Sequence, residues 1–423
     1  MAFLTQILPL IFIKLNAGLK TVMLIYSVSF IIIYYLIFLI CIYLFSSLKA
    51  GLACTFVLFM GISDCSLYPI TELQLGLMFC TMFYGFLEYY FLHEKLFSSN
   101  KKYLLLFIGG AIILMSLFSH PSTLFAILFM LFFQGFDKQL HKNKAIYVLI
   151  LFTLIAYSIK FLSVDKNSYE AQQMNPINNM FAILGNITNT NSFHFFLKFV
   201  LKGVYVLPII LFLITAVYYF MKREILKLAF TTCAIIGFFI LLMIVFSPGD
   251  IDVGMEKNLM PLWIFITIPF IHDVLFHKFR YRFMQVIIFS LVVVIGLSGF
   301  YRATVIYGDR IRYMQQVLET SEHTFNSDKI IIEKKNLNQD RLGSNWSYAN
   351  ETLLLSSLEG PQYSKSVYIV DDLNQIKDYN MQKKDVYLCV SFWLQWDYSS
   401  LNPKYFQLPE KPYKIIESPI LGE

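Results

Sequence analysis

Residues 226–246 read LKLAFTTCAIIGFFILLMIVF and carry one charge, at Lys227. A helix that crosses the hydrocarbon core of a bilayer needs about 20 apolar residues, so this run is long enough to span a membrane. The run is apolar on all sides instead of along one stripe, which is typical of a helix surrounded by lipid or by other helices. The stretch therefore predicts a transmembrane helix.

Similar apolar runs recur through most of the chain. The run at 51–63 has only 13 residues, and a re-entrant piece fits it as well as a full span does. The repetition predicts an all-α polytopic membrane protein with about ten transmembrane helices. We expect these helices at residues 22–45, 51–63, 73–93, 103–118, 121–136, 145–163, 195–220, 226–246, 258–276 and 283–301.

The overall composition agrees with this class. Hydrophobic residues make up 57% of the 423 positions and charged residues 15%, whereas a soluble domain carries about 25% charge. A single soluble fold and a disordered chain are excluded. The net charge of +6 is spread over short loops and forms no basic face, which excludes a nucleic-acid binder. The six cysteines show no CxxC or Cys/His spacing, so we interpret them as packing thiols.

The distribution of charge divides the chain into two domains. Residues 1–302 contain 21 basic and 12 acidic residues, and residues 303–423 contain 13 and 16. We therefore predict a transmembrane domain at 1–302 and a small soluble α/β domain at 303–423. The second domain is expected to begin with a helix at 305–324. Strand-like runs follow at Lys329–Glu333, Ser366–Val370, Asp385–Ser391 and Tyr413–Glu417.

Basic residues predict the orientation, because cytoplasmic loops of membrane proteins are rich in Lys and Arg. If all ten spans cross, the basic clusters at 95–102, 138–144, 222–227 and 278–282 fall on one side. We expect that side to be the cytoplasm and the membrane to be the cytoplasmic (inner) membrane of a bacterium. The loops at 63–72, 119–120, 164–194 and 247–257 and the C-terminal domain would then be extracytoplasmic.

Two carboxylates flank the loop at 63–72, which is short and lies between two apolar runs. Asp64 and Glu72 would bind a divalent metal there, since hard cations prefer oxygen ligands. Alternatively, one of them would act as a general base toward an acceptor hydroxyl. A purely structural alternative is a solvated loop in which Glu72 caps the next helix.

Two groups of basic residues occur in other outer segments. His120 lies in the hairpin Ser119-His120-Pro121, where it would contact a phosphate or cap a helix. His194, Lys198 and Lys202 have i, i+4, i+8 spacing and would share one face of the helix at 195–220. This stripe suits a lipid phosphate, although lysines at that depth also reach out to headgroups.

The last outer loop contains further charged candidates. Asp250 and Asp252 form a DxD motif that would bind a metal, although such pairs are common in solvated loops. Glu256 and Lys257 precede the helix at 258–276 and are candidates for substrate binding, or alternatively a cap and an interfacial anchor. The inner acidic residues alternate with Lys and Arg, so we interpret them as ordinary loop pairs. They are Glu88, Glu94, Asp137, Glu224 and Asp273.

Three stretches together resemble the GT-C superfamily of polytopic glycosyltransferases, especially the bacterial branch with the aminoarabinose transferase and the protein O-mannosyltransferases. They are the short helix that runs into Asp64 and Glu72, the hairpin at His120, and EKNLMPL at residues 256–262. With the hydropathy pattern, the resemblance covers residues 1–302.

This resemblance implies a sugar donor on a polyprenyl phosphate, transfer to an extracytoplasmic glycan, lipid or protein, and sometimes a divalent metal such as Mg²⁺ or Mn²⁺. Asp64 and Glu72 correspond to the carboxylates of the family's second outer loop. The family's first acidic loop follows a first helix that has no counterpart here. We therefore expect an N-terminally truncated chain or a degenerate homologue.

Three other classes compete with a transferase. An O-antigen polymerase or ligase usually has one large outer loop rich in Arg and His, whereas the loop at 164–194 contains only one lysine. A flippase or transporter often has internal repeats and charges near the midplane, and we find no repeat. A non-catalytic membrane scaffold would bind a partner through its C-terminal domain. Donor-dependent labelling of an acceptor would separate a transferase and a polymerase or ligase from a flippase or transporter and a scaffold.

Overall fold

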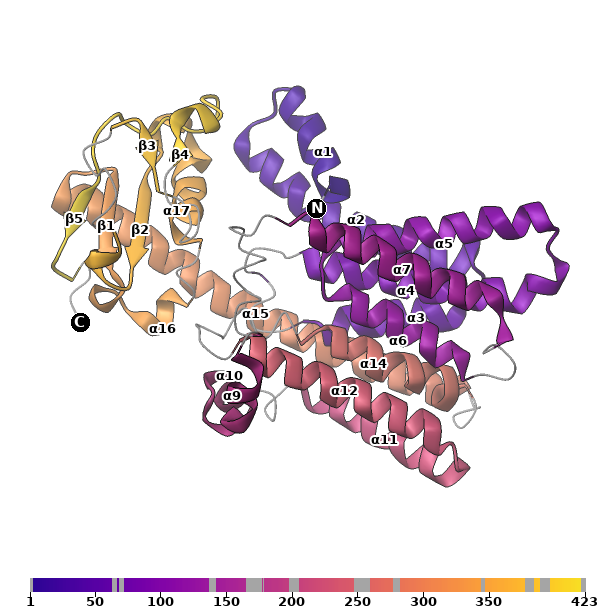
Figure 1. The fold of residues 1–423 in the computed structure, drawn as a ribbon. Coiled ribbons are helices and arrows are strands. Elements are labelled where there is room, and N and C mark those ends of the chain that lie inside the picture. The colour runs from indigo at the N-terminus through magenta and orange to yellow at the C-terminus, as the bar shows by residue number, and fades with distance from the viewer. Residues whose placement is uncertain are drawn as a thin grey trace. The chain divides into compact units, whose positions relative to one another are not determined.

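The computed structural model groups the chain by its contacts into two units (Figure 1). The first unit contains Met1–Gln6 and Val28–Ala303, and the second contains Ile7–Ser27 and Thr304–Glu423. The structure describes residues 3–62, 67, 72–136, 142–164, 177, 179–197, 205–246, 259–276, 282–343, 347–376, 384–388 and 396–419.

Helices dominate the chain up to residue 303. Because lipid offers no hydrogen-bond partner, apolar segments in a bilayer satisfy their backbone groups within a helix. In chain order the helices are α1 (Phe3–Lys14), α2 (Leu19–Leu39), α3 (Leu48–Met60), α4 (Glu72–His93), α5 (Ser99–Ser119), α6 (Thr123–Gly135), α7 (Lys144–Leu162), α9 (Met180–Gly185), α10 (Asn191–Phe195), α11 (Val206–Lys222), α12 (Ile225–Val245), α14 (Pro261–Pro269) and α15 (Arg282–Phe325).

Six of the described helical segments are long and apolar enough to cross a membrane. They contain α2, α4, α5, α7, α12 and α15. The other four expected spans correspond to shorter apolar helices, namely α3, α6, α11 and α14 with the π-helical turn η8 (Phe270–Leu275). The chain is therefore a helical membrane protein, and the count of about ten crossings stays a prediction.

The helix α4 is the centre of the first unit. Its side chains are buried along most of its length, and it packs against α3, α5 and α6. A methyl group built on Gly85 would lie 2.9 Å from the Ala50 Cβ atom of α3. Small residues at such crossings allow membrane helices to approach closely. The helix α14 packs in turn against α3, α6, α11 and α12, so it joins the helices around α4 to the α11–α12 pair.

Two helices differ from their expected bounds. The short helix α3 runs from Leu48 to Met60 instead of 51–63, because the Ser47 hydroxyl accepts a hydrogen bond from the Ala50 N–H (3.1 Å) and caps it three residues earlier. The expected helix at 195–220 is found as α11 from Val206 onward. The segment before it contains the five-residue helix α10, which ends at Phe195.

The second unit contains a three-stranded parallel sheet with the order β2-β1-β5. The strands β1 (Lys329–Glu333) and β2 (Ser366–Val370) have the predicted bounds, and β5 is Lys414–Ile416. Within the strand expected at 385–391, β3 (Val386–Tyr387) pairs antiparallel with β4 (Trp396–Asp397), and residues 389–391 lie outside the described residues. The helices α16 (Gln339–Leu342) and α17 (Tyr348–Ser356) lie between β1 and β2 in the chain.

The helix expected at 305–324 is the C-terminal part of α15, a helix of 44 residues that begins at Arg282. Its residues Tyr313, Met314 and Val317 form one apolar core with Ile330 and Ile332 of β1. The opposite face of the sheet packs against a second core that includes Tyr413. The C-terminal region is thus an α/β unit, because alternate residues of β1 are buried on opposite faces.

Candidate functional site

One end of the first unit brings together three candidate residues that the structure describes, Glu72, His120 and His194. A methyl group built on Gly61, just after α3, would lie 3.7 Å from the Met260 Sδ atom, so the end of α3 faces the start of α14. Because α3 and α4 run antiparallel, with Ala50 beside Gly85, the first residue of α4, Glu72, lies at the same end. We call it the Glu72 end.

The hairpin between α5 and α6 is packed onto the first turns of α4. A methyl group on Gly76 would lie 2.7 Å from the Thr123 Cγ2 atom and 3.2 Å from the Ser119 Cβ atom. The Thr123 hydroxyl donates to the backbone oxygens of Ser116 (2.9 Å) and His120 (2.7 Å), which holds the hairpin in shape. Glu72 is one turn before Gly76, so the structure brings its helix end beside the His120 hairpin.

The protonation state of His120 follows from its hydrogen bonds. Its Nδ1 atom accepts a hydrogen bond from the Ser122 backbone N–H (3.2 Å), and the Ser122 hydroxyl lies 2.7 Å from the same nitrogen. A backbone N–H can only donate, so Nδ1 carries no proton and Nε2 does. Burial, together with the charge of Lys160, lowers the pKa of His120 to about 4. His120 is therefore a neutral imidazole that offers one N–H donor.

His194 belongs to α10 and its side chain is exposed. The helix α10 packs on the last turns of α12, since the Ser192 hydroxyl donates to the Met243 carbonyl oxygen (3.0 Å). The rings of Phe196 and Phe239 also lie edge to face with centroids 4.4 Å apart. His194 is thus at the Glu72 end on α10, and residues 198–204, between α10 and α11, lie outside the described residues.

The other candidates lie outside the described residues. They are Asp64, Lys198, Lys202, Asp250, Asp252, Glu256 and Lys257. Among described neighbours, Tyr205 at the start of α11 stacks on Trp263 of α14, with ring centroids 5.8 Å apart. Within the described residues, no group of three or more His, Cys, Asp or Glu side chains is arranged to hold a metal ion. The metal hypothesis thus stays a prediction.

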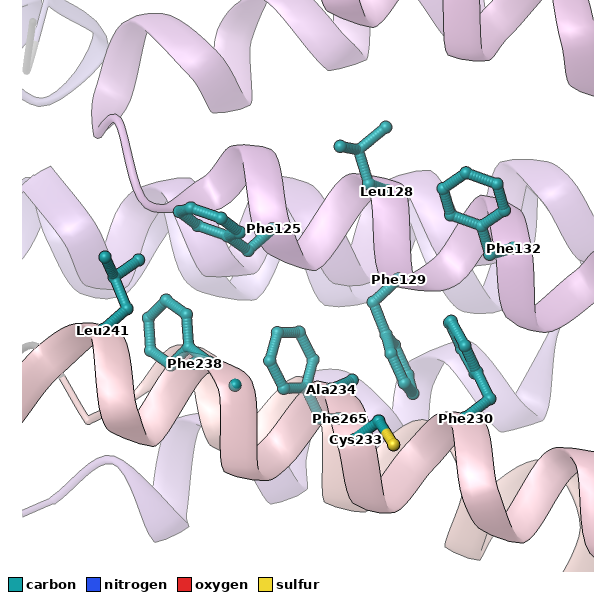
Figure 2. Close-up of a pocket in the computed structure, with 11 residues that line it drawn as sticks. Phe125, Leu128, Phe129, Phe132, Phe230, Cys233, Ala234, Phe238, Leu241 and Phe265 are labelled. Atoms are coloured by element: carbon teal, nitrogen blue, oxygen red, sulfur yellow. The ribbon is translucent and has the colours of Figure 1, made fainter. Parts of the chain in front are cut away.

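A phenylalanine-lined groove of about 290 Å³ lies between α6, α12 and α14 (Figure 2). Phe125 faces Phe238 with ring centroids 5.4 Å apart, and Phe129 faces Phe230 at 5.3 Å. Phe265 closes the groove from α14, 4.7 Å from Phe129. The groove follows α6 away from Phe125, which is only five residues after His120. The sequence analysis missed it, although Phe125, Phe129 and Phe132 share one helical face.

A buried polar cluster lies at the other end of α4. His272 and Asp273 are consecutive residues of the π-helical turn η8, and both are buried. The Nδ1 atom of His272 lies 3.2 Å from Oε1 of Glu88 and 2.9 Å from the Tyr84 hydroxyl oxygen. Glu88 also accepts a hydrogen bond from the Gln134 side chain (3.3 Å) and pairs with Lys49 (3.5 Å). His272 thereby links α14 to α3, α4 and α6.

Asp273 contacts the other two helices of this region, α11 and α12. Its Oδ2 atom accepts a hydrogen bond from the Tyr219 hydroxyl of α11 (2.7 Å) and pairs with the Lys227 ammonium of α12 (3.0 Å). Lys227 also lies 3.4 Å from Glu224. We call His272, Asp273 and their partners the His272–Asp273 hub.

The hub corrects the interpretation of the inner acidic residues as ordinary loop pairs, which is wrong for Glu88 and Asp273. Asp273 is buried and Glu88 is half-buried, and each pairs with side chains on helices distant in the chain, because those helices pack against one another. Ionisable residues at membrane depth are costly and often functional, and π-helical turns occur frequently at functional sites. The sequence did offer a signal for these two residues, because Glu88 and Asp273 are charged residues inside the apolar runs at 73–93 and 258–276.

No protein-family model matches the chain, no curated protein is significantly similar to it, and no solved structure is either. The class of protein is therefore assigned from the fold and the candidate site alone. It is a helical membrane protein with a small parallel α/β unit and two separate polar regions in its helical part.

Proposed function

We propose that this chain is a membrane glycosyltransferase that moves a sugar from a polyprenyl-phosphate-linked donor to an extracytoplasmic glycan, lipid or protein. The observation that carries the proposal is the position of the phenylalanine-lined groove, which begins beside the His120 hairpin at the Glu72 end. An apolar chain lying in the groove would leave its phosphate beside a neutral N–H donor and a carboxylate.

The proposed chemistry assigns different tasks to the two described side chains. Attack by an acceptor hydroxyl needs a general base, and among the residues that the structure describes Glu72 is a carboxylate at this end. The departing phosphate needs hydrogen-bond donors where its charge develops, and the Nε2–H group of His120 is such a donor. His194, Lys198, Lys202, Glu256 and Lys257 are proposed to bind the rest of the substrate. Asp64 and Glu72 have suitable oxygen ligands for Mg²⁺, but the described residues form no metal site, so we derive no step through a metal.

The first prediction concerns Glu72→Gln in the full chain reconstituted in bilayer discs. Polyprenyl-linked sugars extracted from the native membrane and labelled with tritium serve as donors, and label transferred to membrane acceptors is counted. General bases contribute about 10²–10⁴-fold to rate, so transfer is expected to fall at least about 100-fold.

The matched control is Glu94→Gln at the opposite end of the unit, where Glu94 pairs with Lys102 (3.9 Å). It removes the same charge and should retain the rate of the unmodified chain. Absence of donor-dependent labelling in the unmodified chain, or equal rates in both variants, would contradict the proposed function.

The second prediction concerns the groove. Gly237 lines it, and a Cβ atom added there would contact nothing within 4 Å, so Gly237→Leu should fill the groove without a backbone clash. Binding of a fluorescent polyprenyl phosphate is expected to weaken about tenfold, which corresponds to about 1.4 kcal/mol. Ile236→Phe adds a similar bulk at an exposed position of the same helix and should not change binding. Equal affinity in both variants would place the lipid elsewhere.

A further inference from the structure

The helices α1 and α2 form a hairpin whose two arms differ in length. The helical segment that begins with α2 is long and apolar enough to cross a membrane, whereas α1 has 12 residues and is too short to do so. The proposed transfer chemistry involves neither of these helices, so the inference below does not rest on the proposed function.

A proline inside α1 explains how the two arms are joined. Pro9 has no backbone N–H, so it cannot donate to the carbonyl oxygen of Thr5, four residues earlier. The Ser29 hydroxyl of α2 donates to this oxygen (2.7 Å), and Thr5 and Ser29 are both fully buried. Inside membranes, serine side chains of neighbouring helices satisfy carbonyl groups that prolines free in this way. The hydrogen bond fixes the first turn of α1 against α2.

This hydrogen bond lies at the level of the Glu72 end. A methyl group built on Gly51 of α3 would lie 3.4 Å from the Phe38 Cε2 atom of α2, so these two residues are side by side. Ser29 is nine residues before Phe38, and the end of α3 is nine residues after Gly51. Because a short turn at 45–47 makes the two segments antiparallel, both positions lie about 14 Å from that contact in the same direction. The first turn of α1 is therefore at an end of the helical unit, where membrane-spanning helices meet the headgroups.

The exposed face of α1 is largely apolar, unlike that of a helix that faces water. The neighbouring helix α2, which is long enough to cross the membrane, also exposes leucine and isoleucine side chains, so both arms present apolar surface. Residues 1–63 contain no Asp or Glu that would repel an anionic lipid. The exposed large side chains of α1 and of the residue after it, between 38% and 70% exposed, are Leu4, Leu10, Ile11 and Leu15.

Positive charge gathers at the turn between α1 and α2. Lys14 and Lys20 flank the turn, and both are exposed. The Lys404 ammonium of the second unit donates to the Ala17 carbonyl oxygen in the turn (3.3 Å), and the Tyr405 hydroxyl donates to the same oxygen (2.9 Å). Three ammonium groups beside an apolar surface are complementary to a layer of anionic phosphate headgroups above acyl chains.

We propose that α1 and the α1–α2 turn bind the surface of the bilayer as an interfacial hairpin. The apolar face of α1 contacts acyl chains, and the ammonium groups of Lys14, Lys20 and Lys404 contact the phosphates of anionic phospholipids. Since Lys404 and Tyr405 also hold the turn, the hairpin links the C-terminal α/β unit to the lipid surface.

The test places the photoreactive residue benzoylphenylalanine at Leu10 (48% exposed) of the full chain, in bilayer discs of phosphatidylcholine and phosphatidylglycerol. The control carries the same residue at Ile415 of β5 (42% exposed). After irradiation, mass spectrometry of the chain's peptides should find intact phospholipid attached at position 10 and none at position 415. Leu10 is one turn before Lys14 on the same helical face. Phosphatidylglycerol should therefore be enriched among these adducts about fivefold over its share in the discs.

Two lysine variants of the chain labelled at Leu10 test the headgroup contact. Lys14→Gln should reduce the enrichment to less than half, whereas Lys414→Gln should retain it, because the Lys414 ammonium donates to the Phe325 carbonyl oxygen at the end of α15 (3.0 Å). If the chain labelled at Leu10 fails to fold, Ile11 (45% exposed) takes its place. The proposal is overturned if position 10 gives no phospholipid adduct, if it is joined only to protein, such as a second copy of the chain, or if Lys14→Gln retains the full enrichment.

Discussion

Asp273→Asn should destabilise the helical unit by about 3 kcal/mol, because breaking a buried ion pair removes the buried carboxylate that compensates the Lys227 charge. Asp273 accepts from both Lys227 (3.0 Å) and Tyr219 (2.7 Å). Asparagine can still accept from the Tyr219 hydroxyl, so the loss falls on Lys227, which keeps the half-exposed Glu224 (3.4 Å) but loses its nearer, buried carboxylate. The side chains of Lys227 and Asp273 are each 11% exposed, which leaves little water to replace the missing carboxylate.

A double-mutant cycle separates this effect from a change in packing. Lys227→Met alone should cost a similar amount, because it leaves the Asp273 carboxylate buried beside only a hydroxyl. The double variant should be more stable than either single variant by at least about 1 kcal/mol, since both buried charges of the pair are gone. Unfolding in mixed SDS and detergent micelles measures the three differences. Lys102→Met breaks the more exposed Lys102–Glu94 pair and should cost at most about 1 kcal/mol. Strictly additive losses would show that the pair is not coupled.

Gly76→Leu should prevent the helical unit from assembling, with an expected loss of more than about 3 kcal/mol. Even the Cβ atom would lie 2.7 Å from Thr123 Cγ2 and 3.2 Å from Ser119 Cβ. Thr123 cannot move aside easily, because its hydroxyl is bonded to two backbone oxygens and its side chain is buried. Overpacking a well-packed core commonly costs about 1–3 kcal/mol for a few added methylenes. Here the added leucine would collide with the α5–α6 hairpin, which the Thr123 hydrogen bonds hold in place.

Gly76→Ala tests the same contact more gently and should cost about 1–2 kcal/mol. Gly237→Ala is the matched control, since a Cβ atom there meets nothing within 4 Å and alanine is the better helix former. It should be neutral or slightly stabilising in the same unfolding assay. If Gly76→Ala is as stable as Gly237→Ala, α4 and the His120 hairpin do not pack as tightly as described.

Most individual elements of the fold could be predicted from the sequence. The runs of apolar residues marked the positions of α4, α5, α7 and α12, because a segment in lipid satisfies its backbone hydrogen bonds by itself. The strands β1 and β2 were predicted with their observed bounds, as short β-branched runs between polar segments. The start of α3 was misplaced by three residues, because its cap depends on one hydroxyl, that of Ser47.

The candidate site was predictable only in part. The sequence marked Glu72, His120 and His194 from their polarity beside apolar runs, and the structure places all three at one end of the helical unit. The sequence did not indicate that Nδ1 of His120 accepts a hydrogen bond from the Ser122 backbone N–H. This hydrogen bond leaves Nε2 as the imidazole nitrogen that can donate. The sequence analysis also missed the groove, since the facing rings come from helices about one hundred residues apart in the chain.

The sequence by itself determined that this is a helical membrane protein with a C-terminal α/β unit, because hydropathy and β-propensity act over a few neighbouring residues. Only the tertiary structure decided which charges are buried together. Glu88 and His272 are 184 positions apart, yet their side chains lie 3.2 Å from each other. Asp273, the next residue, pairs with Lys227 on another helix. The cost of burying a charge depends on its partners in space, and no local pattern of residues specifies which helices will supply them.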